Sequence, residues 1–177
     1  LLFEGTSILV QVIKDAIGTK GARLSTQISI AGRMLVYLPY ESHIGISQRI
    51  EDNAERESLR EKLQRALPPE DKGGYIIRTM AEAASESDLR ADIEYLHKLW
   101  HDIQNKSLSA SPPALLYQDL DLSHRVLRDF LDESITGIIV DSRETHQKLK
   151  AFAQNFMSNV TDKIDHYTGE RPLFDLY

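Results

Sequence analysis

The sequence predicts a mixed α/β fold, of the α+β kind, made of two small units. Short β-branched segments alternate with amphipathic helical patterns along the chain. A Ser/Pro-rich loop at residues 107–113 is the candidate domain boundary, and residues 123–156 then follow the order helix, strand, helix. With 177 residues and a mass of 20.1 kDa, the chain is long enough to bury a core. We expect two packed α/β units whose sheets are not continuous.

Four strand patterns lie in the first unit. β-branched content and the alternation of apolar with polar residues indicate strands at 8–14, 24–30, 33–39 and 74–79. Pro39 ends the third strand, and a polar loop through His43, Gly45 and Arg49 is expected to follow it. Residues 18–21 form a glycine-bracketed loop that presents Lys20. This loop is either a hairpin turn or a small phosphate cradle, although it lacks the glycine spacing and the Lys-Ser/Thr pair of a P-loop.

Two helices are expected in the same unit. Asp52 or Asn53 caps the first, whose leucines repeat at every fourth position until the Pro-Pro pair at 68–69 ends it. Ser85 and Asp88 have capping-box spacing at the start of the second, longer helix. Its apolar stripe consists of Leu89, Ile93, Leu96, Trp100 and Ile103.

The second unit is shorter. Ser123 is expected to cap a short helix, and residues 137–141 have the pattern of a buried strand. A helix then runs to about Phe156. Asp141 lies at the carboxyl end of the strand, a position that often carries chemistry in α/β folds, but it is also the expected cap of that helix.

Composition excludes several classes of protein. The net charge of −6 argues against a polybasic nucleic-acid-binding surface, although residues 1–40 carry +2 and the remainder −8. The absence of cysteine excludes disulfides and thiolate metal sites and fits a cytoplasmic location. No apolar run approaches the roughly 18 residues of a membrane span. His97 and His101 lack the His-Glu-x-x-His pattern of a zinc site, and no Gly-x-Ser-x-Gly nucleophile motif occurs.

The strongest functional candidates are Arg78 and Thr79. A glycine pair at 73–74 and three strand-forming residues precede them, so both lie where a strand ends. A guanidinium offers several donors in a rigid fork and the hydroxyl adds one more, which together can bind a phosphate or a carboxylate. The alternative is that Arg78 closes a salt bridge at the strand end.

Seven sequence blocks, in order, resemble the ribonuclease E/G family and cover essentially the whole chain. They are Val-Ile-Lys-Asp-x-x-Gly-Thr-Lys-Gly-Ala-Arg-Leu-Ser-Thr at 12–26, Arg-Met-Leu-Val-Tyr-Leu-Pro at 33–39, Gly-Ile-Ser-Gln-Arg-Ile-Glu at 45–51, Ile-Arg-Thr at 77–79, Val-Leu-Arg-Asp-Phe at 126–130, Val-Asp-Ser-Arg at 140–143, and His-Tyr-Thr-Gly at 166–169 with Pro-x-Phe-Asp-Leu at 172–176.

This resemblance implies a division into three parts. Residues 1–26 resemble the end of an OB-type RNA-binding domain, 27–123 an RNA 5′-sensor domain, and 124–177 a ribonuclease H-like segment. The expected fold is therefore a strand-rich sensor unit packed with a small ribonuclease H-like α/β unit. In the family, a separate DNase I-like domain supplies the carboxylates that hold Mg²⁺, so no catalytic and no metal-binding residue is expected in these residues.

The resemblance also assigns roles to single residues. Arg78 and Thr79 match the pair that binds a terminal phosphate. Gly32 and Val36 match positions that help to seat the first nucleotide, and Lys20 matches an RNA-contacting lysine. For Gly32 and Val36 the residues by themselves indicate only a strand break and a core position.

The function that we expect is RNA binding and 5′-monophosphate sensing within a magnesium-dependent, single-strand endoribonuclease of ribosomal RNA maturation and messenger RNA turnover. The implied partner is single-stranded RNA with a 5′-monophosphate, and the full-length enzyme is expected to be a homo-oligomer in the cytoplasm. These residues alone are expected not to cleave RNA. The alternatives are a non-catalytic protein-interaction module, which the acidity and the amphipathic helices favour, and a small-anion-binding domain that uses Arg78.

Overall fold

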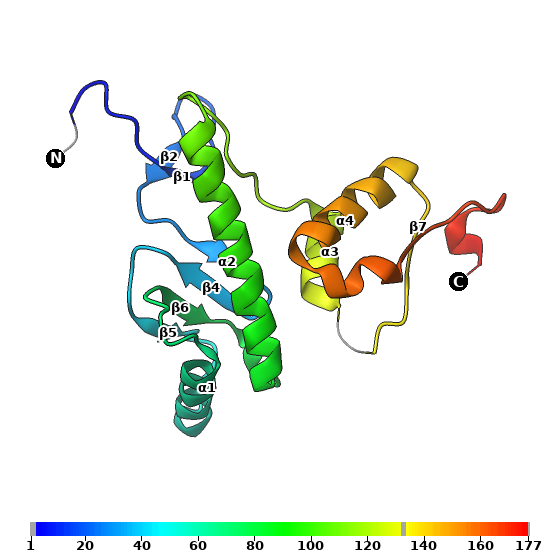
Figure 1. The fold of residues 1–177 in the computed structure, drawn as a ribbon, viewed down its shortest axis with the longest axis horizontal. Coiled ribbons are helices and arrows are strands. Elements are labelled where there is room, and N and C mark those ends of the chain that lie inside the picture. Colours follow the sequence, from blue (N-terminus) through cyan, green and yellow to red (C-terminus); the bar gives the residue numbers. More distant parts are fainter. Residues whose placement is uncertain (1–2, 132–133, 177) are drawn as a thin grey trace. The chain divides into compact units, whose positions relative to one another are not determined.

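The computed structural model describes residues 3–131 and 134–176 (Figure 1). The chain forms two compact units, Leu1–Tyr117 and Gln118–Tyr177. Both contain helices and strands, so the expected mixed α/β class is confirmed. No helix among the described residues is long and apolar enough to cross a membrane.

A four-stranded sheet is the centre of the first unit. Its strands are β3 (Ile30–Ala31), β4 (Leu35–Leu38), β5 (Ile44–Ile46) and β6 (Gly74–Ile77), in the spatial order β3-β4-β6-β5. β4 is antiparallel to β3 and β6, whereas β5 is parallel to β6. A separate antiparallel pair, β1 (Gln11–Lys14) and β2 (Arg23–Ser25), precedes this sheet.

Two helices cover one face of that sheet. α2 (Glu86–Ser109) contacts β3 and β4, and α1 (Asn53–Ala66) contacts β5 and α2 (Figure 1). Because side chains alternate along a strand, every second residue faces the helices. Leu35, Tyr37, Tyr75 and Ile77 are the buried residues of β4 and β6 on this face. Val36 and Ile76 pair with each other between them and are only half-buried, so they lie on the opposite face.

Both helices begin where local sequence signals predict. The Asp52 carboxylate accepts a hydrogen bond of 2.7 Å from the N–H of Glu55, which confirms an Asp52 cap. At the start of α2, the Asp88 N–H donates to the Ser85 hydroxyl at 3.1 Å. The Ser85 N–H donates in turn to the Asp88 carboxylate at 2.9 Å, which completes the expected capping box.

The second unit combines two helices with a short parallel sheet. α3 (Leu122–Phe130) and α4 (Arg143–Phe156) accompany β7 (Ile138–Val140) and β8 (Ile164–His166). Leu127, Leu149 and Ile164 are in its core. β7 belongs to a different sheet from the strands of the first unit, which confirms that the sheets are not continuous.

Strand boundaries depart from the sequence pattern in the first unit. The strand expected at 24–30 is wrong, because only its two ends pair, in β2 and β3. In the gap, the Gln11 side chain binds the backbone of Ser29, accepting from its N–H at 2.8 Å and donating to its carbonyl at 3.0 Å. The Gln11 side chain thus takes the place of backbone hydrogen bonds from a neighbouring strand. β5 lies inside the polar loop that was expected through His43, Gly45 and Arg49, and the sequence pattern did not indicate it because it is a three-residue strand with a central glycine.

Two caps in the second unit also differ. The Asp121 carboxylate, not the Ser123 hydroxyl, caps α3 by accepting from the N–H of His124 at 3.0 Å. This bond and that from the His124 ring lower the pKa of Asp121 to about 2. The Ser142 hydroxyl, not Asp141, caps α4, because it accepts from the N–H of Thr145 at 3.2 Å. β8 was missed as well, being only three residues long.

Candidate functional site

Arg78 is held by backbone groups at the end of β6. Its N–H donates to the carbonyl of Met34 at 2.8 Å. Its guanidinium Nη1 donates to the carbonyl of Gly32 and, at 3.1 Å, to that of Arg33. Within residues 3–131 and 134–176, Arg78 has no carboxylate partner, and its Nη2 and Nε make no hydrogen bond. The described residues therefore lack the strand-end salt bridge that was the alternative for this side chain.

Thr79 follows Arg78 in the chain and begins a short 3₁₀ segment, Thr79–Ala81. The residue is half-buried. Its hydroxyl makes no hydrogen bond to any other described residue. Adjacent residues thus provide two kinds of donor without a partner among the described residues: the Nε and Nη2 edge of Arg78 and the hydroxyl of Thr79. Together these donors can bind the oxygens of a phosphate.

Gly32 is buried between the guanidinium and α2. A Cβ on Gly32 would lie 2.6 Å from both carboxylate oxygens of Asp92, which is closer than real Cβ atoms approach. The Gly32 N–H donates to the carbonyl of Leu35 at 2.8 Å, while its carbonyl accepts from Arg78. Only glycine fits this position without displacing the carboxylate.

Asp92 is the residue of this network that sequence reasoning missed. It lies on α2, is 7% exposed, and accepts from three consecutive backbone N–H groups at 2.8–2.9 Å. One signal could have found it. Asp92 occupies the apolar stripe between Leu89 and Ile93, where a charged side chain must have buried donors as partners.

The remaining expected residues differ in position. Val36 pairs with Ala31 of β3 and Ile76 of β6, so it lies on the strand that adjoins both Gly32 and Arg78. Lys20 lies in the turn between β1 and β2, where Ile17 and Lys20 exchange backbone hydrogen bonds. Gly18 in that turn has a φ of +59°, as a two-residue hairpin favours, and the Lys20 side chain is exposed.

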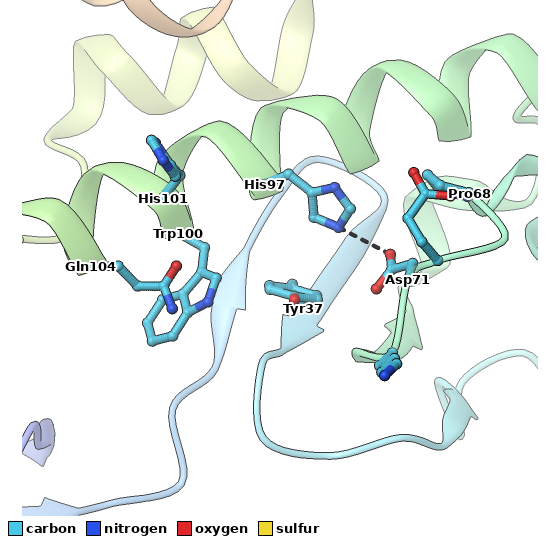
Figure 2. A pocket seen from close by; sticks show the side chains of 9 residues that line it. Tyr37, Pro68, Asp71, His97, Trp100, His101 and Gln104 are labelled. Carbon is cyan, nitrogen blue, oxygen red and sulfur yellow. Dashed lines mark ion pairs between the residues drawn. The ribbon is translucent and has the colours of Figure 1, made fainter.

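A second polar cluster lies on the helix-covered side of the sheet, beside a hollow of about 330 Å³ (Figure 2). The Tyr75 hydroxyl donates to the Asp71 carboxylate at 2.6 Å, and His97 Nε2 lies 3.0 Å from the same oxygen. The Tyr37 ring stacks at an angle on Tyr75, with centroids 5.1 Å apart. His97 is therefore occupied by a structural contact, and the described residues contain no cluster of three or more His, Cys, Asp or Glu that could hold a metal.

We expect this cluster to make stability fall above pH 10. Burial, followed by the hydrogen bond to Asp71, raises the pKa of Tyr75, and burial also raises that of Tyr37. The unfolded chain loses these phenolic protons near pH 10 and the folded chain does not, so the stability present below pH 10 is lost as pH rises. Urea titrations of wild type and Tyr75→Phe between pH 8 and 11 measure this effect. A decline that is equally steep in Tyr75→Phe would exclude Tyr75 as its source.

Comparison with known proteins points to one family. The sequence profile described as the Ribonuclease E/G family matches residues 29–177. Ribonuclease G of Escherichia coli (strain K12) is 42% identical over all 177 residues, which are 36% of its length. Ribonuclease G of Haemophilus influenzae is 40% identical over all 177 residues, which again are 36% of its length. Ribonuclease E of Nostoc sp. is 36% identical, and this chain covers 26% of it. The chain thus spans about a third or less of the length of these relatives.

Proposed function

Because the chain belongs to the ribonuclease E/G family, we propose that it is the 5′-end-sensing part of a single-strand endoribonuclease that acts in ribosomal RNA maturation and messenger RNA turnover. Arg78 and Thr79 bind the 5′-monophosphate of the RNA. Gly32 and Val36 seat the first nucleotide, and Lys20 contacts RNA from the β1–β2 turn. In this proposal residues 1–26 end an OB-type domain, 27–123 form the sensor, and 124–177 return to a ribonuclease H-like segment.

One observation carries the proposal: Arg78 is fixed in place but lacks an anionic partner among the described residues. The carbonyls of Gly32 and Arg33 both accept hydrogen bonds from Nη1, so the Nε and Nη2 edge is left for a ligand. Two parallel N–H donors on this edge match two oxygens of a phosphate. A terminal monophosphate carries more charge than an internal phosphodiester, and its additional oxygen can accept from Thr79. This is the physical basis of end selection.

The proposed enzyme uses Mg²⁺, but the described residues do not fit that ion. Phosphodiester hydrolysis requires carboxylates that converge on the metal. The described residues contain no group of three or more candidate ligands. We therefore assign Mg²⁺ to a part of the enzyme outside these residues and expect the isolated chain not to cleave RNA. A cytoplasmic location and a homo-oligomeric enzyme belong to the same proposal.

The test is binding of the purified chain to two oligoribonucleotides of identical sequence, one with a 5′-monophosphate and the other with a 5′-hydroxyl. Fluorescence anisotropy should give a lower Kd for the monophosphate by roughly tenfold or more, the value of about one charge-assisted hydrogen bond. Equal Kd values would contradict the sensor. A free nucleoside monophosphate that competes as well as the RNA would indicate a small-anion-binding domain instead.

A further inference from the structure

We propose that Asp92 positions Arg78 through the backbone of residues 32–35 and thereby sets the preference for a 5′-phosphate. This inference rests on the proposed function of Arg78. Asp92 touches no ligand in this proposal. It acts on the segment that holds the guanidinium, so it is a positioning residue.

The carboxylate of Asp92 gathers three consecutive N–H groups. Oδ1 accepts from Arg33 at 2.9 Å, and Oδ2 accepts from Met34 at 2.9 Å and from Leu35 at 2.8 Å. β4 begins only at Leu35, so the Arg33 and Met34 N–H groups have no strand ladder to join. A carboxylate 7% exposed on a rigid helix supplies the acceptors instead.

The carbonyls of the same three peptide groups bind Arg78. The first peptide group joins Gly32 to Arg33, and its Gly32 carbonyl accepts from Arg78 Nη1. The second joins Arg33 to Met34, and its Arg33 carbonyl accepts from the same Nη1 at 3.1 Å. The third peptide offers the Met34 carbonyl to the Arg78 N–H at 2.8 Å. Each peptide group therefore lies between the Asp92 carboxylate on its N–H side and Arg78 on its carbonyl side.

This arrangement couples the two charged groups. Hydrogen bonds in series polarise one another, so a carboxylate on the N–H side makes each carbonyl a better acceptor for the guanidinium. The carboxylate also fits tightly under the segment, since a Cβ on Gly32 would lie 2.6 Å from either oxygen. Fixing Nη1 in this way orients the Nε and Nη2 edge that the phosphate requires. The segment can relax if the acceptor is lost, and Arg78 then loses its orientation.

The test uses Asp92→Asn with Asp102→Asn as the matched control. An Asn has one acceptor oxygen and one donor nitrogen, so at least one of the three N–H groups would face a donor. Asp102 lies on the same helix and pairs with Lys106 at 2.7 Å, so its replacement makes the same charge change away from the segment. The measurement is the ratio of Kd for 5′-hydroxyl over 5′-monophosphate RNA at 10 °C.

We expect Asp92→Asn to reduce this ratio by about tenfold or more, with 5′-hydroxyl binding changed by less than about twofold. Asp102→Asn should keep the wild-type ratio. Amide hydrogen exchange at residues 33–35 should accelerate in Asp92→Asn alone. A merely structural role would lower the thermal midpoint and leave the ratio unchanged, which would overturn the inference.

Gly32→Ala provides the second variant if Asp92→Asn does not fold. It keeps the carboxylate but forces it away from the segment, so the ratio should fall here as well. An unchanged ratio in Gly32→Ala would overturn the inference. If the wild type itself shows no preference for the monophosphate, the proposed function fails; if it shows one that Asp92→Asn retains, only the role of Asp92 is refuted.

Discussion

Replacing Arg78 by Lys should weaken binding of 5′-monophosphorylated RNA by roughly 10- to 150-fold, the value of one lost charge-assisted hydrogen bond of about 1.5–3 kcal/mol. Lys keeps the positive charge but not the fork. It cannot donate to the carbonyls of Gly32 and Arg33 and also present two parallel donors to a phosphate. Binding of 5′-hydroxyl RNA should change little, because that RNA lacks the group that Arg78 recognises.

The measurement is the Kd of both RNAs for wild type, Arg78→Lys and Arg60→Lys. Arg60 is the matched control, because it lies on α1 in an exposed ion pair with Glu57. Arg60→Lys should leave both affinities near the wild-type values. If Arg78→Lys weakens both RNAs equally, Arg78 only stabilises the fold around Gly32 and is not a phosphate ligand.

Replacing Asp71 by Ala should cost about 1–3 kcal/mol of unfolding free energy, because the buried Tyr75 hydroxyl loses the carboxylate to which it donates. Tyr75 is 0% exposed, and His97 Nε2, 2.9 Å from its hydroxyl, remains as a neighbour when the carboxylate is removed. Asp71 also accepts from the N–H of Gly73 at 2.9 Å and lies 3.0 Å from His97, and both contacts would be lost (Figure 2). Urea unfolding at pH 7 gives the free energy.

Two further variants isolate this cause. Tyr75→Phe removes the hydroxyl that donates to Asp71, so this side chain no longer requires an acceptor. Asp71→Ala should therefore cost less in the Tyr75→Phe background than in wild type. Asp102→Ala, which removes an exposed partner of Lys106, should change stability by less than about 0.5 kcal/mol. Equal costs of Asp71→Ala in both backgrounds would show that the Tyr75 hydroxyl transfers its hydrogen bond to His97 Nε2, which lies 2.9 Å away.

The two longest helical patterns of the first unit could be predicted from sequence because their signals are local. The Asp52 cap and the Ser85–Asp88 capping box involve residues three positions apart, so the chain itself contains the interaction. In the second unit, Asp121 and Ser123 are both capping residues within one turn. Residue type alone does not decide which of the two caps α3. In the folded chain the Asp121 carboxylate accepts from the first turn of the helix.

Short strands could not be predicted in the same way. β5 and β8 have three residues each and exist because a partner strand pairs with them. The same reason explains why residues 24–30 do not form one strand: Ser29 is bound by the Gln11 side chain instead of a neighbouring strand. Partners distant in the chain decide such segments.

The sequence by itself determined that Arg78 and Thr79 follow a buried strand, because a glycine pair and three strand formers precede them. Only the tertiary structure decided what holds Arg78. Its partners are carbonyls 45 and 46 residues away, and the Asp92 carboxylate that fixes their segment lies on another element. Contacts between residues so far apart in the chain produce no periodic sequence pattern. A site formed by backbone groups can therefore be identified only from the packed sheet and α2.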